Sequence, residues 1–162
     1  MRSEEEVNQA IERYADTVRR ICMVHLKNES DTEDIFQTVF LKYALFTRAF
    51  QSGEHEKAWM IRVTINACRD LLKSVFRSRT VSLDVLAEQP GELDEEHREV
   101  LEAVLDLPSK YKNVVYLHYY EGYTAAEIGQ ILKKNVNSVY TLLTRARKLL
   151  KEKLEGGMEI EE

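Results

Sequence analysis

The chain has 162 residues, which fits one domain or two small ones, and 44% of them are hydrophobic, enough to form buried cores. Its 2 prolines and 6 glycines permit long helices and argue against a turn-rich β fold. No run of about 18 apolar residues is present to cross a membrane, and the charged N-terminal residues lack the apolar core of a secretory signal. We therefore expect an all-α protein that stays in the cytoplasm without membrane insertion.

The amino-terminal half predicts three helices and one loop. Apolar residues recur every three or four positions over residues 5–26, and the pattern resumes near residue 31 after a polar break. Residues 47–56 contain a glycine and lack this periodicity, which is typical of a loop, and a third helix is expected over residues 57–76. We expect residues 1–78 to form one helical domain.

Helical periodicity fails over residues 79–94, which contain Pro90, Gly91 and four acidic residues. This composition predicts a flexible acidic linker between two small helical domains. Residues 95–155 would form the second domain, followed by a polar, disordered tail over residues 156–162. The helices expected in the second domain cover residues 95–107, 109–121, 125–132 and 136–154.

The net charge of −5 is unusual for a protein that binds nucleic acid, but the charges are unevenly distributed. Residues 133–153 contain seven basic residues and one acid, and residues 57–79 contain six basic residues and one acid. Most of the acidic residues lie in the linker, near residue 31 and at the two ends. Two basic stretches in an acidic chain predict local contacts with DNA and separate surfaces for other partners.

The strongest local pattern predicts a helix-turn-helix within residues 124–150. Thr124 and Glu127 have the spacing of a capping box, which starts a short helix. Gly129 provides the small side chain that the motif needs where its second helix crosses closely, and Asn135 is a suitable N-cap for that second helix.

The turn of this motif departs from the usual pattern. It carries Lys133 and Lys134 where a glycine and then an apolar residue are usual. A non-glycine residue at a positive φ costs about 1 kcal/mol, which the motif can tolerate. An ordinary helical hairpin with a charged, solvated face is the alternative interpretation of these residues.

The second helix of the motif would present a polar face to DNA. Residues near its N-terminus would contact base edges, whereas Arg145, Arg147 and Lys148 would contact the phosphate backbone. The predicted DNA-binding residues are Asn135, Asn137, Ser138, Tyr140, Thr141, Thr144, Arg145, Arg147 and Lys148.

The sequence carries no recognisable catalytic or metal site. It has no glycine-rich phosphate loop and no nucleophile motif. We expect no cofactor, no metal and no enzymatic activity, and we expect Cys22 and Cys68 to be reduced core residues. The histidines have no metal-ligand spacing with one another or with the cysteines, and they are His25, His55, His97 and His118.

Segments from both halves of the chain resemble one known protein family. Residues 105–132 and 137–154 combine a Leu-Pro step, an apolar helix, a Glu-Gly turn and a helix-turn-helix that ends in Arg-Ala-Arg. Residues 31–42 read DTEDIFQTVFLK, and residues 58–74 read AWMIRVTINACRDLLKS. In this order, the segments resemble the promoter-binding domain, the polymerase-docking segment and the minus-ten helix of extracytoplasmic-function (ECF) sigma factors of bacterial RNA polymerase. The resemblance covers nearly the whole chain.

This resemblance implies a sigma factor that binds core RNA polymerase, recognises promoter DNA and helps to open it for transcription initiation. The helix-turn-helix would bind the minus-thirty-five element. The helix that starts near residue 31 would dock on the polymerase through a carboxylate, an amide and an apolar anchor, namely Asp34, Gln37 and Phe40. In the alternative interpretation, Phe40 belongs to the core and the acidic residues only stabilise the start of the helix.

The resemblance assigns the minus-ten element to the loop at residues 47–55 and the helix after it. Opening DNA requires extruded bases to be held in pockets, to which Phe50 would contribute a stacking face. Trp59 lies at an apolar position, and we expect it in the core. The predicted minus-ten residues are Phe50, Gln51, Ser52, His55, Arg62, Asn66, Arg69, Asp70, Lys73 and Arg77.

The resemblance also implies a separate anti-sigma factor as a partner. The acidic linker would either be a plain tether or pass through the polymerase near the RNA exit path. Tyr140 and Leu142 replace residues that are often basic or polar in the family. Two competing functions remain, a stand-alone helix-turn-helix regulator that acts without polymerase and a helical interaction protein with no DNA role.

Overall fold

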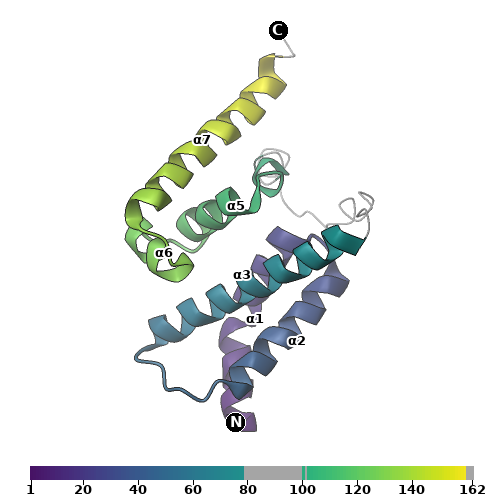
Figure 1. Cartoon of the computed structure of the whole chain (residues 1–162), viewed down its shortest axis with the longest axis vertical. Helices are drawn as coiled ribbons and strands as arrows, with labels where there is room; N and C mark the ends of the chain where they lie inside the picture. Colours follow the sequence, from purple (N-terminus) through teal and green to yellow (C-terminus); the bar gives the residue numbers. More distant parts are fainter. Residues whose placement is uncertain (79–99, 101, 160–162) are drawn as a thin grey trace. The chain divides into compact units, whose positions relative to one another are not determined.

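The computed structural model describes residues 1–78, 100 and 102–159 (Figure 1). Regular secondary structure in this part of the chain is helical, as the sequence predicts. The chain divides into two compact units, Met1–Glu88 and Gln89–Glu162. The predicted linker at residues 79–94 and the last three residues of the predicted tail, 160–162, lie outside the described residues.

The first unit is a bundle of α1 (Glu4–Leu26), α2 (Glu29–Leu45) and α3 (Gly53–Ser78), each of which packs against the other two (Figure 1). Trp59 lies in their shared core, as expected. Burial of each large apolar side chain contributes about 1.5–3 kcal/mol, which explains why three amphipathic helices associate. The core includes Ala10, Tyr14, Val18, Cys22, Leu26, Ile35, Val39, Phe40, Tyr43, Trp59, Met60, Ala67 and Cys68.

Two of these helices begin earlier than the apolar pattern predicts. The side chain of Asn28 accepts a hydrogen bond from the Asp31 N–H at 2.8 Å, so α2 starts at Glu29. The hydroxyl of Ser52 accepts the His55 N–H at 3.1 Å, so α3 starts at Gly53 and the loop shortens to residues 46–52. Both first turns consist of polar residues held by a side-chain cap, which apolar periodicity does not report.

Cys22 and Cys68 are buried and form no disulfide, as predicted. They are distant in sequence, but their Sγ atoms lie 3.9 Å apart, between α1 and α3. Both side chains belong to the core of the first unit, where they act as small apolar residues.

The second unit contains α5 (Ser109–Val115), η2 (Tyr116–Tyr120), α6 (Ala125–Leu132) and α7 (Val136–Glu159). Of the helix expected over residues 95–107, residues 100 and 102–105 are described and helical. The single helix predicted over residues 109–121 changes to a π-helix at η2, where hydrogen bonds reach back five residues. The N–H of Glu121 accordingly donates to the Tyr116 carbonyl at 3.2 Å.

Helix α7 continues beyond residue 154, so residues 156–159 of the predicted disordered tail are helical. Lys151 and Glu155 lie 3.9 Å apart and support this last part of the helix. The core of this unit joins α5 and α7 to the segment that precedes α5. It contains Val104, Leu107, Tyr111, Val115 and Ala146. Among the described helices, none combines the length and apolar character that a membrane crossing requires.

Candidate nucleic-acid interfaces

The helix-turn-helix starts with the predicted capping box. The Thr124 N–H donates to Glu127 Oε1 at 2.9 Å, and the Glu127 N–H donates to the Thr124 hydroxyl at 3.2 Å. The hydrogen bonds from Thr124 hold the pKa of the Glu127 carboxyl below its usual value. These two reciprocal bonds fix the first turn of α6 and therefore its entry into the motif.

The turn adopts the positive-φ backbone conformation that is costly for a non-glycine residue. Lys133 adopts φ 57°, in the left-handed region, and ends α6. The Lys134 N–H donates to the Gly129 carbonyl at 2.8 Å. A Cβ on Gly129 would lie 2.6 Å from the Lys134 carbonyl oxygen and 3.7 Å from Val139 Cγ2. Gly129 is therefore required mainly by the backbone of the turn, and the second helix is the more distant neighbour.

Helix α7 presents the predicted polar face to solvent. The Asn135 side chain accepts the Ser138 N–H at 2.7 Å, which confirms its predicted role as N-cap. Val139, Leu143 and Ala146 are buried, so the opposite face is oriented outward. The exposed residues on or beside that face are Asn135, Asn137, Ser138, Tyr140, Thr141, Thr144, Arg145, Arg147 and Lys148.

Besides Asn135, two of these side chains already have partners. The Thr141 hydroxyl donates to the Asn137 carbonyl at 3.0 Å. Arg147 Nε donates to the Tyr119 hydroxyl at 2.6 Å, and its guanidinium lies over the Tyr119 ring at 5.7 Å. Arg147 is thereby linked to η2, whereas the Tyr140 side chain is 58% exposed near the start of α7.

The loop between α2 and α3, here the 46–52 loop, is held in a defined shape. The Gln51 N–H donates to His55 Nδ1 at 3.0 Å, while Ser52 caps α3 through the His55 N–H. These bonds leave the Gln51 side chain and His55 Nε2 available, because both residues are exposed. The Ser52 hydroxyl is instead already used as the helix cap.

The ring of Phe50, which we predicted to provide a stacking face for a base, packs against other aromatic rings of the first unit. Its ring is half-buried and lies 6.2 Å from the Tyr43 ring, 5.4 Å from that of Phe46 and 5.7 Å from that of Trp59. The aromatic residues around it provide more apolar contact than an exposed position would. Phe50 therefore supports the loop from inside.

The predicted minus-ten residues on α3 differ in exposure. Arg69, Asp70 and Lys73 are exposed, and Arg62 and Asn66 are half-buried. Arg77 belongs to α3, but its side chain lies outside the described residues. The exposed members of this set therefore lie in the second half of α3.

The prediction that Phe40 is a surface anchor is also wrong. Phe40 is 5% exposed, lies in the core and packs against Phe36 with ring centroids 4.7 Å apart. Asp34 and Gln37 are exposed as predicted, and on the same helix Leu41 and Leu45 are each 60% exposed. Spacings of three and four residues place all four on one face of α2. Sequence periodicity missed this face because apolar residues occur on both sides of the helix.

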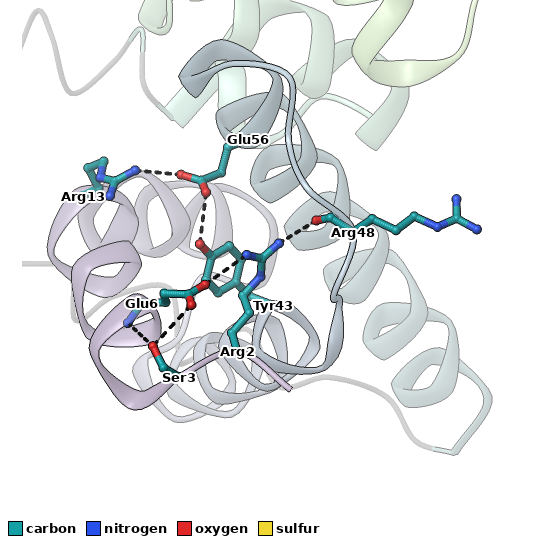
Figure 2. Close-up of polar contacts among 7 residues, drawn as sticks. All are labelled: Arg2, Ser3, Glu6, Arg13, Tyr43, Arg48 and Glu56. Carbon is teal, nitrogen blue, oxygen red and sulfur yellow. Dashed lines mark hydrogen bonds and ion pairs between the residues drawn. The ribbon is translucent and has the colours of Figure 1, made fainter.

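A carboxylate that the sequence does not single out holds the start of α3. Glu56 accepts hydrogen bonds from Arg13 at 2.8 Å, from the Tyr14 hydroxyl at 2.7 Å and from the Tyr43 hydroxyl at 3.0 Å. Figure 2 shows Arg13 and Tyr43 converging on it. Burial and the hydrogen bond to Glu56 raise the pKa of Tyr14 to about 12, and the same causes raise the pKa of Tyr43. The sequence does hold one signal for this carboxylate: Tyr14 and Tyr43 lie at apolar positions of their helices, and buried hydroxyls need hydrogen-bond partners.

No group of histidine, cysteine and acidic residues in the described ranges could hold a metal ion. His118 Nδ1 lies 2.9 Å from the Tyr123 carbonyl oxygen, so this histidine is hydrogen-bonded within its own segment.

Two family models match separate parts of the chain. The model described as Sigma-70 region 2 matches residues 10–78, within the first unit. The model described as Sigma-70, region 4 matches residues 97–150, within the second unit.

Curated relatives match over most of their own length. The RNA polymerase sigma factor SigV of Bacillus subtilis is 28% identical over 138 residues, which cover 83% of this chain and 82% of SigV. The ECF RNA polymerase sigma factor SigW of the same organism is 26% identical over 158 residues, which cover 87% of this chain and 84% of SigW.

Solved structures share the fold. The sigma factor RpoE from Bartonella quintana, in complex with the anti-sigma factor NepR, matches with a TM-score of 0.73 and 18% identity, over 93% of this chain and 98% of RpoE. CnrH, in complex with the cytosolic domain of CnrY, matches with a TM-score of 0.67 and 21% identity, over 95% of this chain and 90% of CnrH.

Proposed function

The chain belongs to the ECF group of the sigma-70 family of RNA polymerase sigma factors, and from this membership we propose a role for each exposed surface described above. The observation that carries the proposal is the presence of both sigma-70 regions in one chain, at residues 10–78 and 97–150. A stand-alone DNA-binding regulator would need only the second of these.

The exposed face of α2 binds core RNA polymerase. Asp34 and Gln37 supply a carboxylate and an amide for hydrogen bonds, and Leu41 and Leu45 supply the apolar area that Phe40 cannot. Apolar groups beside a few polar ones are typical of the centre of a protein interface.

The 46–52 loop and α3 bind the opened minus-ten element. The Gln51 amide and His55 Nε2 are free to hydrogen-bond an extruded base, and Arg69 and Lys73 lie exposed on α3 for nearby phosphates. Asp70 lies beside them as an acceptor for a base amino group. Holding an extruded base offsets the few kcal/mol that unstacking costs.

Helix α7 reads the minus-thirty-five element in the major groove. Asn137, Ser138 and Tyr140 lie exposed in its first turns, where a recognition helix meets base edges. Arg145 and Lys148 lie further along the helix and contact phosphates, which orients the motif without reading sequence.

The protein acts in the cytoplasm without chemistry of its own, and a separate anti-sigma factor controls it. One structural neighbour is bound to an anti-sigma factor. This partner would cover the surfaces that otherwise bind polymerase or DNA.

Reconstituted transcription tests the proposal. Core polymerase with and without this protein is incubated with genomic DNA of the source organism, and the 5′ ends of the transcripts are mapped. We expect a set of shared start sites only with the protein present, and co-purification of the protein with core. DNA binding without either result would favour a stand-alone regulator, and no DNA binding would favour an interaction protein.

A further inference from the structure

We propose that Glu56 and Arg2 are positioning residues that hold the 46–52 loop in the shape that captures a minus-ten base. The inference rests on the proposed function of that loop. Neither residue contacts DNA in this proposal, and both act through the loop. Residues that lock a binding element before the ligand arrives reduce the ordering cost of binding.

Glu56 fixes the end of the loop that leads into α3. Its Oε1 accepts from Arg13 and Tyr14 on α1, and its Oε2 accepts from Tyr43 on α2. The side chain is only 12% exposed. A carboxylate that receives three donors from two other helices forms strong, directional bonds. The first turn of α3 therefore cannot move without breaking contacts to both α1 and α2.

Arg2 fixes the middle of the loop. One terminal nitrogen donates to the Arg48 carbonyl at 2.8 Å, and the guanidinium carbon lies 4.6 Å from the Tyr43 ring centroid and 5.2 Å from that of Phe50. The backbone N–H of Arg2 donates to the Ala44 carbonyl at 2.8 Å. The planar guanidinium can make the hydrogen bond and stack at once, which a lysine cannot.

The two anchors meet at Tyr43. Its hydroxyl donates to Glu56 while its ring lies beneath Arg2 (Figure 2). The Gln51 side chain and His55 Nε2 take no part in these contacts, and both residues are exposed. The network thus restrains the loop backbone and leaves its base-binding groups unoccupied.

The chain offers a matched control for Glu56. Glu54 lies in the same first turn of α3, carries the same charge and is exposed. Removing either carboxylate reduces repulsion of DNA, so electrostatics alone predicts equal or tighter binding for both variants. Positioning predicts weaker DNA binding for Glu56→Ala only. The two explanations therefore predict changes of opposite direction in the DNA affinity of this variant.

The experiment measures binding of a fluorescent single-stranded oligonucleotide to holoenzyme assembled from core polymerase and each variant. The oligonucleotide carries the minus-ten strand of the strongest promoter that the reconstituted transcription experiment identifies. We expect Glu56→Ala to bind it about tenfold more weakly than wild type, and Glu54→Ala to bind it as well as wild type or better. Affinity for core, and binding of the free variants to minus-thirty-five duplex, should be unchanged by both.

A second variant covers the case in which Glu56→Ala fails to fold. Tyr43→Phe keeps the ring beneath Arg2 and removes only the hydroxyl that donates a hydrogen bond to Glu56. We expect this variant to lose less affinity for the strand than Glu56→Ala, but a measurable amount, and to bind core polymerase as tightly as wild type. Equal strand binding by wild type and the folded variants overturns the inference alone. Absence of strand binding by wild-type holoenzyme overturns the proposed function of the loop, and the inference with it.

Discussion

Gly129 is a residue at which one added methyl group has no room. Its Cβ would lie 2.6 Å from the carbonyl oxygen of Lys134, and a backbone atom cannot rotate away as a flexible side chain can. We expect Gly129→Ala to lower the free energy of unfolding of the second unit by about 1–3 kcal/mol. Urea unfolding followed by circular dichroism measures this.

Gly53→Ala is the control for this substitution. Gly53 is the first residue of α3, and nothing lies within 4 Å of a Cβ built on it. Alanine there should be neutral or stabilise by up to about 1 kcal/mol, because it restricts the unfolded chain. Similar effects of the two substitutions would show that the turn can relax around Gly129.

Tyr14 gives the first unit a dependence on alkaline pH. Burial and the hydrogen bond to Glu56 raise its pKa from 10.0 to about 12, so folding favours the protonated phenol. That stabilisation is complete below pH 10 and is lost as the pH rises from 10 through 12. After allowance for solvent screening, we expect a loss of about 1–2 kcal/mol over this range.

Unfolding of wild type and Tyr14→Phe at a series of alkaline pH values checks this expectation. The phenylalanine variant should start less stable, because it lacks the hydrogen bond, and should lose less stability as the pH rises. Parallel pH profiles for the two proteins would contradict the assigned role of Tyr14.

At the scale of the element, the turn of the helix-turn-helix stores strain that a substitution can release. Lys133 adopts φ 57°, a conformation that costs a non-glycine residue about 1–2 kcal/mol. Glycine removes this cost but adds about 0.5–1 kcal/mol of unfolded-state entropy. We expect Lys133→Gly to stabilise the protein by about 0.5–1 kcal/mol, measured as a rise in the midpoint of thermal unfolding.

Lys134→Gly is its control. Lys134 is the next residue, carries the same charge and is not among the described non-glycine residues with positive φ. Glycine there should give no stabilisation, while both variants lose one positive charge near DNA. A gain in stability at Lys134, or none at Lys133, would mean that strain in the turn is not the cause.

At the scale of the whole molecule, we expect DNA binding to depend on the local basic stretches and not on the net charge of −5. We expect Arg145→Ala to weaken binding to all duplexes and to reduce the log-log salt slope by about 1. Asn137→Ala should change sequence preference instead, with a loss of about 1–3 kcal/mol on the preferred site alone. Titrations of specific and random duplex at several salt concentrations separate the two effects.

Each of these variants serves as the control for the other, since both side chains are exposed on α7 and neither contributes to the core. Equal effects of both on specific and random DNA would remove the division between base-reading and phosphate-binding residues.

The sequence by itself determined the features that depend on neighbours in the chain. The helical class, the capping box at Thr124, the N-cap at Asn135 and the costly turn at Lys133 all follow from residue type and spacing over a few positions. The family resemblance, carried by motifs in both halves of the chain, likewise needed no coordinates.

Only the tertiary structure decided which side of α2 faces the bundle. Phe40 and Leu41 are adjacent apolar residues, and one is buried while the other is exposed. Similarly, only the structure shows that Phe50 packs against Tyr43 and Phe46. It also shows that Glu56 accepts hydrogen bonds from Arg13 and Tyr14, more than 40 residues before it, and from Tyr43. Local periodicity cannot determine such partners, because they depend on how three helices pack against one another.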